Sequence, residues 1–209
     1  MARIKEGILG GFSGKIGNIV GVRNSDGSCT IRSRQAVVNN PQSPAQQTQR
    51  VGFGLCASLF KIAEPFVAQG LRNVAGKKPR GAFISLNSRT AIGGTYPDLH
   101  IDYQYLTVAE GLLMPADSPV LSWNPDDNLA FSWTDNSGQG IAKADDRAML
   151  LVINPEKKDC LYSLKGNDRS SEQDILEIPN AYRHDELHAY IAFTTSNDTM
   201  ISDSVYLAV

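Results

Sequence analysis

The sequence is poor in the residues that mark several large classes of protein. It has three cysteines in 209 residues, Cys29, Cys56 and Cys160, odd in number and far apart. Disulfide frameworks and zinc clusters need more cysteines at closer spacing, so we expect reduced thiols, no metal and no cofactor. No apolar run is long enough to cross a bilayer, and residues 8–12 are too short for the apolar core of a signal peptide. We therefore expect cytoplasmic synthesis and no membrane partner.

The charge is unevenly distributed along an otherwise ordinary globular composition. The chain is 42% hydrophobic and 20% charged, with a net charge of -2. Residues 1–100 hold 13 Lys or Arg and 4 Asp or Glu, whereas residues 101–209 hold 7 and 18. Such a split indicates a partner, and another copy of the chain fits it, because basic and acidic halves are complementary head to tail. The alternative is that the acidic residues only keep a β-rich domain soluble.

The first 40 residues are rich in glycine and favour extended structure. Residues 16–23 and 28–34 are β-prone, and Asn24-Ser25-Asp26-Gly27 between them has the composition of a hairpin turn. The glycines before them indicate close backbone approach or pairing with a neighbour. We therefore predict a β-hairpin in an N-terminal arm.

A helical region follows, and its start is the clearest local signal in the chain. Ser43 can cap a helix, Pro44 suits the first helical position, and Gln46 completes a capping box. Pro65 is expected to kink or end this helix. A second helix is predicted over residues 81–91, and a strand over 99–108. The apolar stripe of the first helix consists of Val51, Leu55, Leu59, Ile62 and Phe66.

The last part of the chain reads as all-β. Seven short strands in about 90 residues, separated by turn residues, have the count and spacing of an immunoglobulin-like sandwich. We therefore predict an α+β region, made of a β-hairpin plus helices, over residues 1–116, and an all-β immunoglobulin or fibronectin III-like sandwich over 117–209. The expected strands cover residues 120–123, 129–134, 148–153, 160–164, 174–178, 187–195 and 202–209.

Several apparent motifs lack a residue that their chemistry requires. Residues 10–15 look like a phosphate loop, but Ile16 stands where a hydroxyl must reach magnesium. Residues 52–57 match a loose dinucleotide pattern inside a predicted helix. His184 and His188 resemble a zinc pair, but they enter a strand, which holds residues four apart about 13 Å from each other. We read them as solvated, and the sequence predicts no enzyme, although an unfamiliar active site stays open.

Two resemblances add to this interpretation. The order of apolar runs Leu-Ala-Phe-Ser-Trp, Met-Leu-Leu-Val-Ile and Ala-Tyr-Ile-Ala-Phe resembles a fibronectin type III module, which implies a spacing or binding role. The opening MARIKEGILGGFSGKIG and the segment NNPQSPAQQ resemble, over the full length, an uncharacterised bacterial family known as a domain of unknown function. That segment is also similar to one in small phage and prophage structural proteins.

Together these features predict a non-enzymatic structural or assembly protein of a phage-like virion or mobile element. Its partners would be other copies of itself and further structural proteins, with nucleic acid as a less favoured partner. The alternative is a cytoplasmic module that binds protein or glycan through sandwich loops near residues 135–140 and 196–199. The residues expected to make the contacts are Phe12, Ile16, Val20, Val22, Arg32, Arg34 and Arg50.

Overall fold

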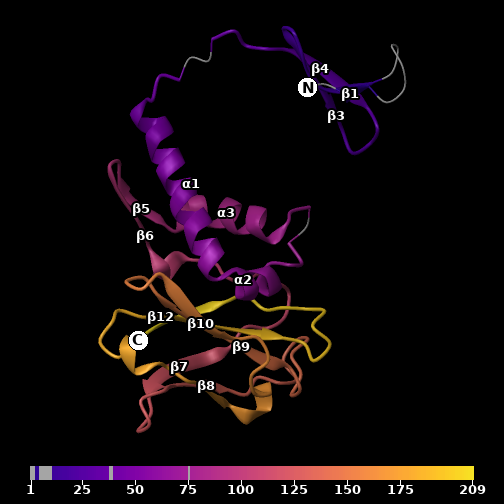
Figure 1. Cartoon of the computed structure of the whole chain (residues 1–209). Coiled ribbons are helices and arrows are strands. Elements are labelled where there is room, and N and C mark those ends of the chain that lie inside the picture. The colour runs from indigo at the N-terminus through magenta and orange to yellow at the C-terminus, as the bar shows by residue number, and fades with distance from the viewer. Residues whose placement is uncertain (1–2, 5–10, 38–39, 75) are drawn as a thin grey trace. The chain divides into compact units, whose positions relative to one another are not determined.

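The computed structural model of the chain forms two compact units (Figure 1). It describes residues 3–4, 11–37, 40–74 and 76–209. The N-terminal unit is Met1–Ser43 and the C-terminal unit is Pro44–Val209. The boundary predicted between residues 116 and 117 lies inside the C-terminal unit, where a strand begins. Whether residues 117–209 fold on their own stays a prediction.

The N-terminal unit is a four-stranded antiparallel sheet in the order β1-β2-β3-β4. Its strands are β1 Arg3–Ile4, β2 Phe12–Ile16, β3 Ile19–Arg23 and β4 Cys29–Ser33. The hairpin predicted around residues 24–27 is confirmed, because Arg23 pairs with Cys29. The run predicted over residues 16–23 is interrupted by a turn at Gly17 and Asn18, so it supplies parts of two strands.

The C-terminal unit begins with three helices. These are α1 Pro44–Ile62, α2 Glu64–Gly70 and α3 Pro79–Thr90. As predicted, Pro44 opens the first helix, and Pro65 lies where it is interrupted, in the first turn of α2. The two helices meet at 96°; no single helix in the described part of the chain is long and apolar enough to span a membrane, although this bent pair meets the criterion together.

The buried face of α1 is rotated relative to the predicted apolar stripe. Leu59 is buried as predicted, but Val51 and Leu55 are only half-buried. The other buried residues of α1 are Gly52, Cys56 and Phe60. Glycine and cysteine are small enough to let the helix approach its neighbours closely, which an apolar periodicity count does not register.

A hairpin and a connecting segment link the helices to the sheets. The hairpin consists of β5 Ile92–Thr95 and β6 Asp98–Ile101, followed by the 3-10 turn η1 Tyr103–Tyr105, so the strand predicted over 99–108 ends early. The buried Asn87 amide binds the connecting segment. Its Oδ1 accepts from the N–H of Thr107 at 2.7 Å, and its Nδ2 donates to the Thr107 carbonyl at 2.9 Å.

The remaining strands form two antiparallel sheets, ordered β10-β9-β12-β13 and β11-β8-β7. Each overlaps a strand predicted from the sequence. Their bounds are β7 Asp117–Trp123, β8 Leu129–Thr134, β9 Arg147–Asn154, β10 Asp159–Ser163, β11 Gln173–Leu176, β12 His188–Thr194 and β13 Val205–Ala208. Two 3-10 turns, η2 Arg169–Ser171 and η3 Asn180–Tyr182, lie in the connections.

The four-stranded sheet is buried on both faces. Leu150 and Val152 of β9 share a cluster with Phe131 of β8, whereas the alternating Met149 and Leu151 share another with the helices. Figure 1 shows the same order within this unit, with helices on one side of β9 and β12 and with β7 and β8 on the other. The four-stranded sheet is thus the middle layer of a three-layer unit, with the helices on one face and β7, β8 and β11 on the other.

Candidate functional site

The N-terminal sheet presents two faces of different chemistry. Paired residues share a face, and neighbours along a strand alternate. Ile16 pairs with Ile19, and Gly21 pairs with both Gly14 and Ile31. One face, called here the Phe12 face, therefore consists of Phe12, Gly14, Ile16, Ile19, Gly21, Arg23, Cys29, Ile31 and Ser33. The opposite Val20 face carries Ser13, Lys15, Val20, Val22, Thr30 and Arg32.

Tight turns set the register of this sheet. Gly17 occupies the first central position of the β2–β3 turn with a φ of 55°, which glycine adopts without strain. In the β3–β4 turn, Asp26 accepts hydrogen bonds from the hydroxyl of Ser28 at 2.7 Å and from its N–H at 2.8 Å. These bonds hold the pKa of the Asp26 carboxyl below its usual value. The hairpins are thus well defined locally, without support from a core.

The sheet has no hydrophobic core among its described residues. Ile31 is 59% exposed, Ile16 is 42% exposed and Val22 is 40% exposed, and among the residues whose burial the structure describes the first buried hydrophobic side chain is Cys56. A sheet needs a hydrophobic face packed against something to be stable. Three isoleucines of the Phe12 face, Ile16, Ile19 and Ile31, are therefore exposed apolar side chains on a sheet whose described residues form no core.

The predicted contact residues lie on different parts of the molecule. Phe12 and Ile16 share the Phe12 face, whereas Val20, Val22 and Arg32 lie on the opposite face. The charged residues divide as well. Arg34 follows β4 and its N–H donates to the Asn18 carbonyl at 2.6 Å, while Arg50 belongs to α1 in the C-terminal unit.

A second surface of interest is a groove of about 700 Å³ in the C-terminal unit. We call it the Leu112 groove. Its walls are two segments far apart in sequence, residues 107–112 and 200–204, with Asn73 and Val74 at one side. Its volume is in the range of ligand sites, but it is lined by exposed Leu112 and by carboxylates of Glu110 and Asp203, without a histidine or cysteine.

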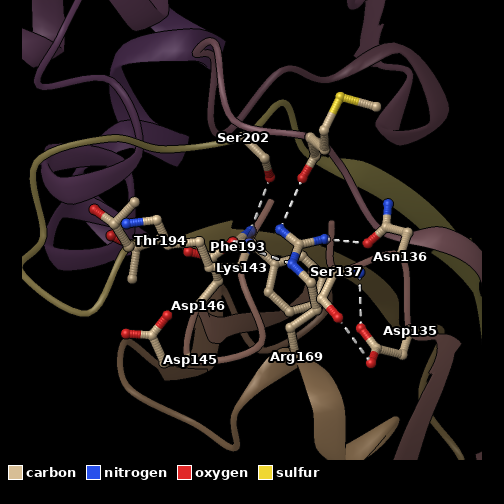
Figure 2. A network of polar contacts seen from close by, with 12 residues as sticks. Asp135, Asn136, Ser137, Lys143, Asp145, Asp146, Arg169, Phe193, Thr194 and Ser202 are labelled. Carbon is tan, nitrogen blue, oxygen red and sulfur yellow. Dashed lines mark hydrogen bonds and ion pairs between the residues drawn. The ribbon is translucent and has the colours of Figure 1, made fainter. Parts of the chain in front are cut away.

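A buried charged network lies beside the β8–β9 connection (Figure 2). The Arg169 guanidinium is fully buried; its Nε donates to Asp146 at 3.2 Å and its Nη1 to Asn136 at 2.5 Å. Its Cζ atom lies 3.8 Å from the centre of the Phe193 ring, over the ring face. Burial lowers the pKa of Arg169 and the facing carboxylate opposes that shift. Every donor is directed into the protein, so we assign this network to folding.

No local sequence pattern indicates this network, because its residues are far apart in the chain, and one histidine differs from its predicted state. His188 is 8% exposed; its ring stacks on Tyr103 at 4.0 Å, and its Nδ1 lies 3.0 Å from the Tyr206 hydroxyl. The prediction that it is solvated is wrong, because β12 is buried on both faces. His184 is exposed, as expected. In the described part of the chain no three His, Cys, Asp or Glu side chains gather as metal ligands would.

Comparison with known proteins gives one match. A model described as a family of unknown function, DUF6266, covers residues 11–208 and thus spans both units. No curated protein and no solved structure matches the chain. The resemblance to a family of unknown function is therefore confirmed over residues 11–208, which include the NNPQSPAQQ segment, and the chain belongs to DUF6266.

Proposed function

We propose that this protein is a non-enzymatic structural or assembly protein that associates with further copies of itself through its N-terminal sheet. The observation that carries the proposal is the exposure of Ile16, Ile19 and Ile31 on the Phe12 face of a sheet whose described residues form no core. Covering an isoleucine or phenylalanine side chain stabilises by about 1.5–3 kcal/mol when burial is complete. The sheet is thus stabilised most when a partner surface covers Phe12, Ile16, Ile19 and Ile31 together.

The charges favour another copy as that partner. The sequence of the N-terminal unit holds 6 Lys or Arg and 2 Asp or Glu, whereas the C-terminal unit holds 14 and 20. A contact between unlike surfaces of identical chains is heterologous and produces rings or filaments. Rings and filaments of identical chains are typical of structural components of particles. We therefore propose that the protein is made in the cytoplasm and belongs to a phage-like virion or a related mobile element.

We further infer that residues 117–209 have the immunoglobulin or fibronectin III type of strand arrangement. The fourth of the seven strands, β10, pairs with β9, and the fifth, β11, pairs with β8. Three strands therefore face four, whereas a constant-type immunoglobulin domain has the fourth strand on the other sheet. This order supports a fibronectin III-like sandwich that carries a helical layer on its four-stranded sheet.

The same arrangement supports a second candidate, a cytoplasmic module that binds protein or glycan through loops. Antibody variable domains bind through the loops after their second and sixth core strands. Here the corresponding loops contact each other, because the Ser196 hydroxyl donates to Asp145 at 2.9 Å. Residues 135–140 and 196–199 lie in these two loops and would form the binding surface.

Sedimentation velocity of the full chain separates the two candidates. The double variant with Phe12→Ser and Ile31→Ser should be monomeric. The control variant Val120→Ser should assemble like the wild type, because Val120 of β7 is as exposed as Ile31 but lies in the other unit. If the wild type and both variants are all monomeric, the result supports the loop-binding module. Assembly that requires added nucleic acid, read from the ratio of absorbance at about 260 and 280 nm, contradicts self-association.

A further inference from the structure

The Leu112 groove has fixed walls. Ser204 Oγ accepts from the N–H groups of Val108 and Ala109 at 3.3 Å each, and the Asp203 carboxylate accepts from the N–H of Gly111 at 3.0 Å. A side chain at position 111 would meet the Ile201 carbonyl, so only glycine fits. The groove is thus formed without a partner, which lowers the entropic cost of filling it.

The groove combines an apolar centre with an acidic rim. Leu112 is 85% exposed and lies with Val74 and Met200 in the lining. Glu110 and Asp203 are exposed, and neither forms an ion pair with the described residues. No Lys or Arg is among the lining residues. An exposed leucine inside an acidic surround indicates a partner that is itself apolar and basic.

We propose that the Leu112 groove receives the N-terminal sheet of a second copy of this chain. The inference rests on the proposed function and names the surface that the sheet would cover. The Phe12 face supplies exposed Ile16 and Ile31 for contact with Leu112, and it also carries Arg23. Lys15 and Arg32 lie on the opposite face and add to the overall positive charge of the sheet. Each copy then uses its sheet on one neighbour and its groove on the other.

The size of the sheet sets the strength of this contact. Strands of five residues, spaced by about 4.8 Å and rising about 3.4 Å per residue, present a face of only a few hundred Å². Stable interfaces bury about 800 Å² on each partner. We therefore expect association that depends on concentration, and on salt because charged groups contribute to it.

Two variants of the full chain test the groove separately from the sheet. Leu112→Lys combined with Glu110→Lys changes exposed residues only and should weaken self-association at least tenfold. Ile175→Lys is its control, because Ile175 of β11 is 55% exposed and lies outside the groove. Ile31→Asp removes the sheet contact. Mixing the groove variant with the sheet variant should restore one productive interface and give a 1:1 dimer that does not grow further.

The outcomes distinguish the groove from the assembly itself. If the groove variant assembles like the wild type while Ile31→Asp does not, the groove proposal is wrong and self-association stands. The same result is expected if the N-terminal sheets of two copies pair with each other and the groove takes no part. If the wild type is monomeric, both proposals are overturned.

Discussion

The ring of Phe12 lies directly over Gly21, so that a Cβ at position 21 would stand 2.6 Å from two ring carbons and 2.5 Å from the Phe12 carbonyl. Real side chains do not come this close, and Gly21 is accordingly buried, although Val20 is only half-buried and Val22 is exposed. The missing side chain at position 21 therefore fixes the orientation of Phe12 and the shape of the Phe12 face.

This relationship predicts that Gly21→Ala disrupts the β2–β3 pairing and weakens self-association by tenfold or more, measured by sedimentation velocity. The thermal unfolding of the C-terminal unit should not change. Gly54→Ala is the matched control, because nothing lies within 4 Å of the added Cβ in α1; alanine there stabilises a helix by about 0.5–1 kcal/mol. Unaltered assembly of Gly21→Ala would show that the Phe12 face is not used.

A second prediction concerns the layers of the C-terminal unit. A chain cut before Asp117 loses the helices that cover Met149, Leu151, Ile153 and Tyr190. Exposing four such side chains costs on the order of 10 kcal/mol, which equals the whole stability of a typical domain. Residues 117–209 alone should therefore bind a hydrophobic dye and aggregate, whereas residues 44–209 should unfold cooperatively by circular dichroism. A cooperative, dye-free fragment 117–209 would instead support the boundary predicted from the sequence.

The buried ion pair gives a third prediction. Arg169→Met leaves the Asp146 carboxylate buried without its partner, and this should cost about 3–5 kcal/mol of the free energy of unfolding. Arg169→Lys should also be costly, because a lysine cannot reach Asp146, Asn136 and the Met114 carbonyl together. Denaturant titration measures both.

The matched control for that experiment is Arg147→Met. Arg147 and Asp168 form an ion pair whose side chains are about half exposed, and such pairs contribute less than about 1 kcal/mol. Replacing both buried partners, Arg169→Met with Asp146→Leu, should recover part of the loss. If Arg169→Met and Arg147→Met have equal effects, the network does not stabilise the fold as argued.

A fourth prediction is a dependence of stability on pH through His188. Burial lowers the pKa of His188 below 6.5, and the nearby carboxylates of Glu186 and Asp102 offset this only in part. The unfolded chain then takes up a proton more readily than the folded protein. Protonation of His188 therefore does not reduce the free energy of unfolding above pH 6.5. The free energy of unfolding falls as the pH drops from 6.5 through the pKa of His188 in the folded protein.

Denaturation midpoints measured between about pH 8 and about pH 5 test this sign. His188→Gln should flatten the curve over that range, and His184→Gln, at an exposed residue, should leave it unchanged. A wild-type curve that rises as the pH falls would mean that the ion pair with Glu186, at 3.6 Å, outweighs burial.

The strands of the C-terminal unit were predictable because their signals are local. Leu129, Phe131 and Trp133 alternate with smaller residues, and Asn124 begins a turn whose hydrogen bonds close within four residues. The packing of helices against one face of the four-stranded sheet was not predictable in the same way. The unbroken apolar run from Ala148 to Ile153 is typical of a strand buried on both faces, but it does not say which element covers the second face.

The two candidate surfaces depend on information that periodicity does not contain. In an uninterrupted strand Ile16, Val20 and Val22 would share a face, but the two-residue turn at Gly17 pairs Ile16 with Ile19 and reverses the alternation. Arg169 and Asp146 are 23 residues apart, and the Leu112 groove joins segments about 90 residues apart. Only the fold brings these residues together.

The central claim is that copies of this chain associate head to tail through a basic sheet and an acidic groove. Its most direct test is the molar mass in solution by light scattering, over a range of protein concentrations at low and high salt. We expect a mass that rises with concentration in multiples of 22.7 kDa and falls as salt increases. A constant mass of one chain under all these conditions would contradict it.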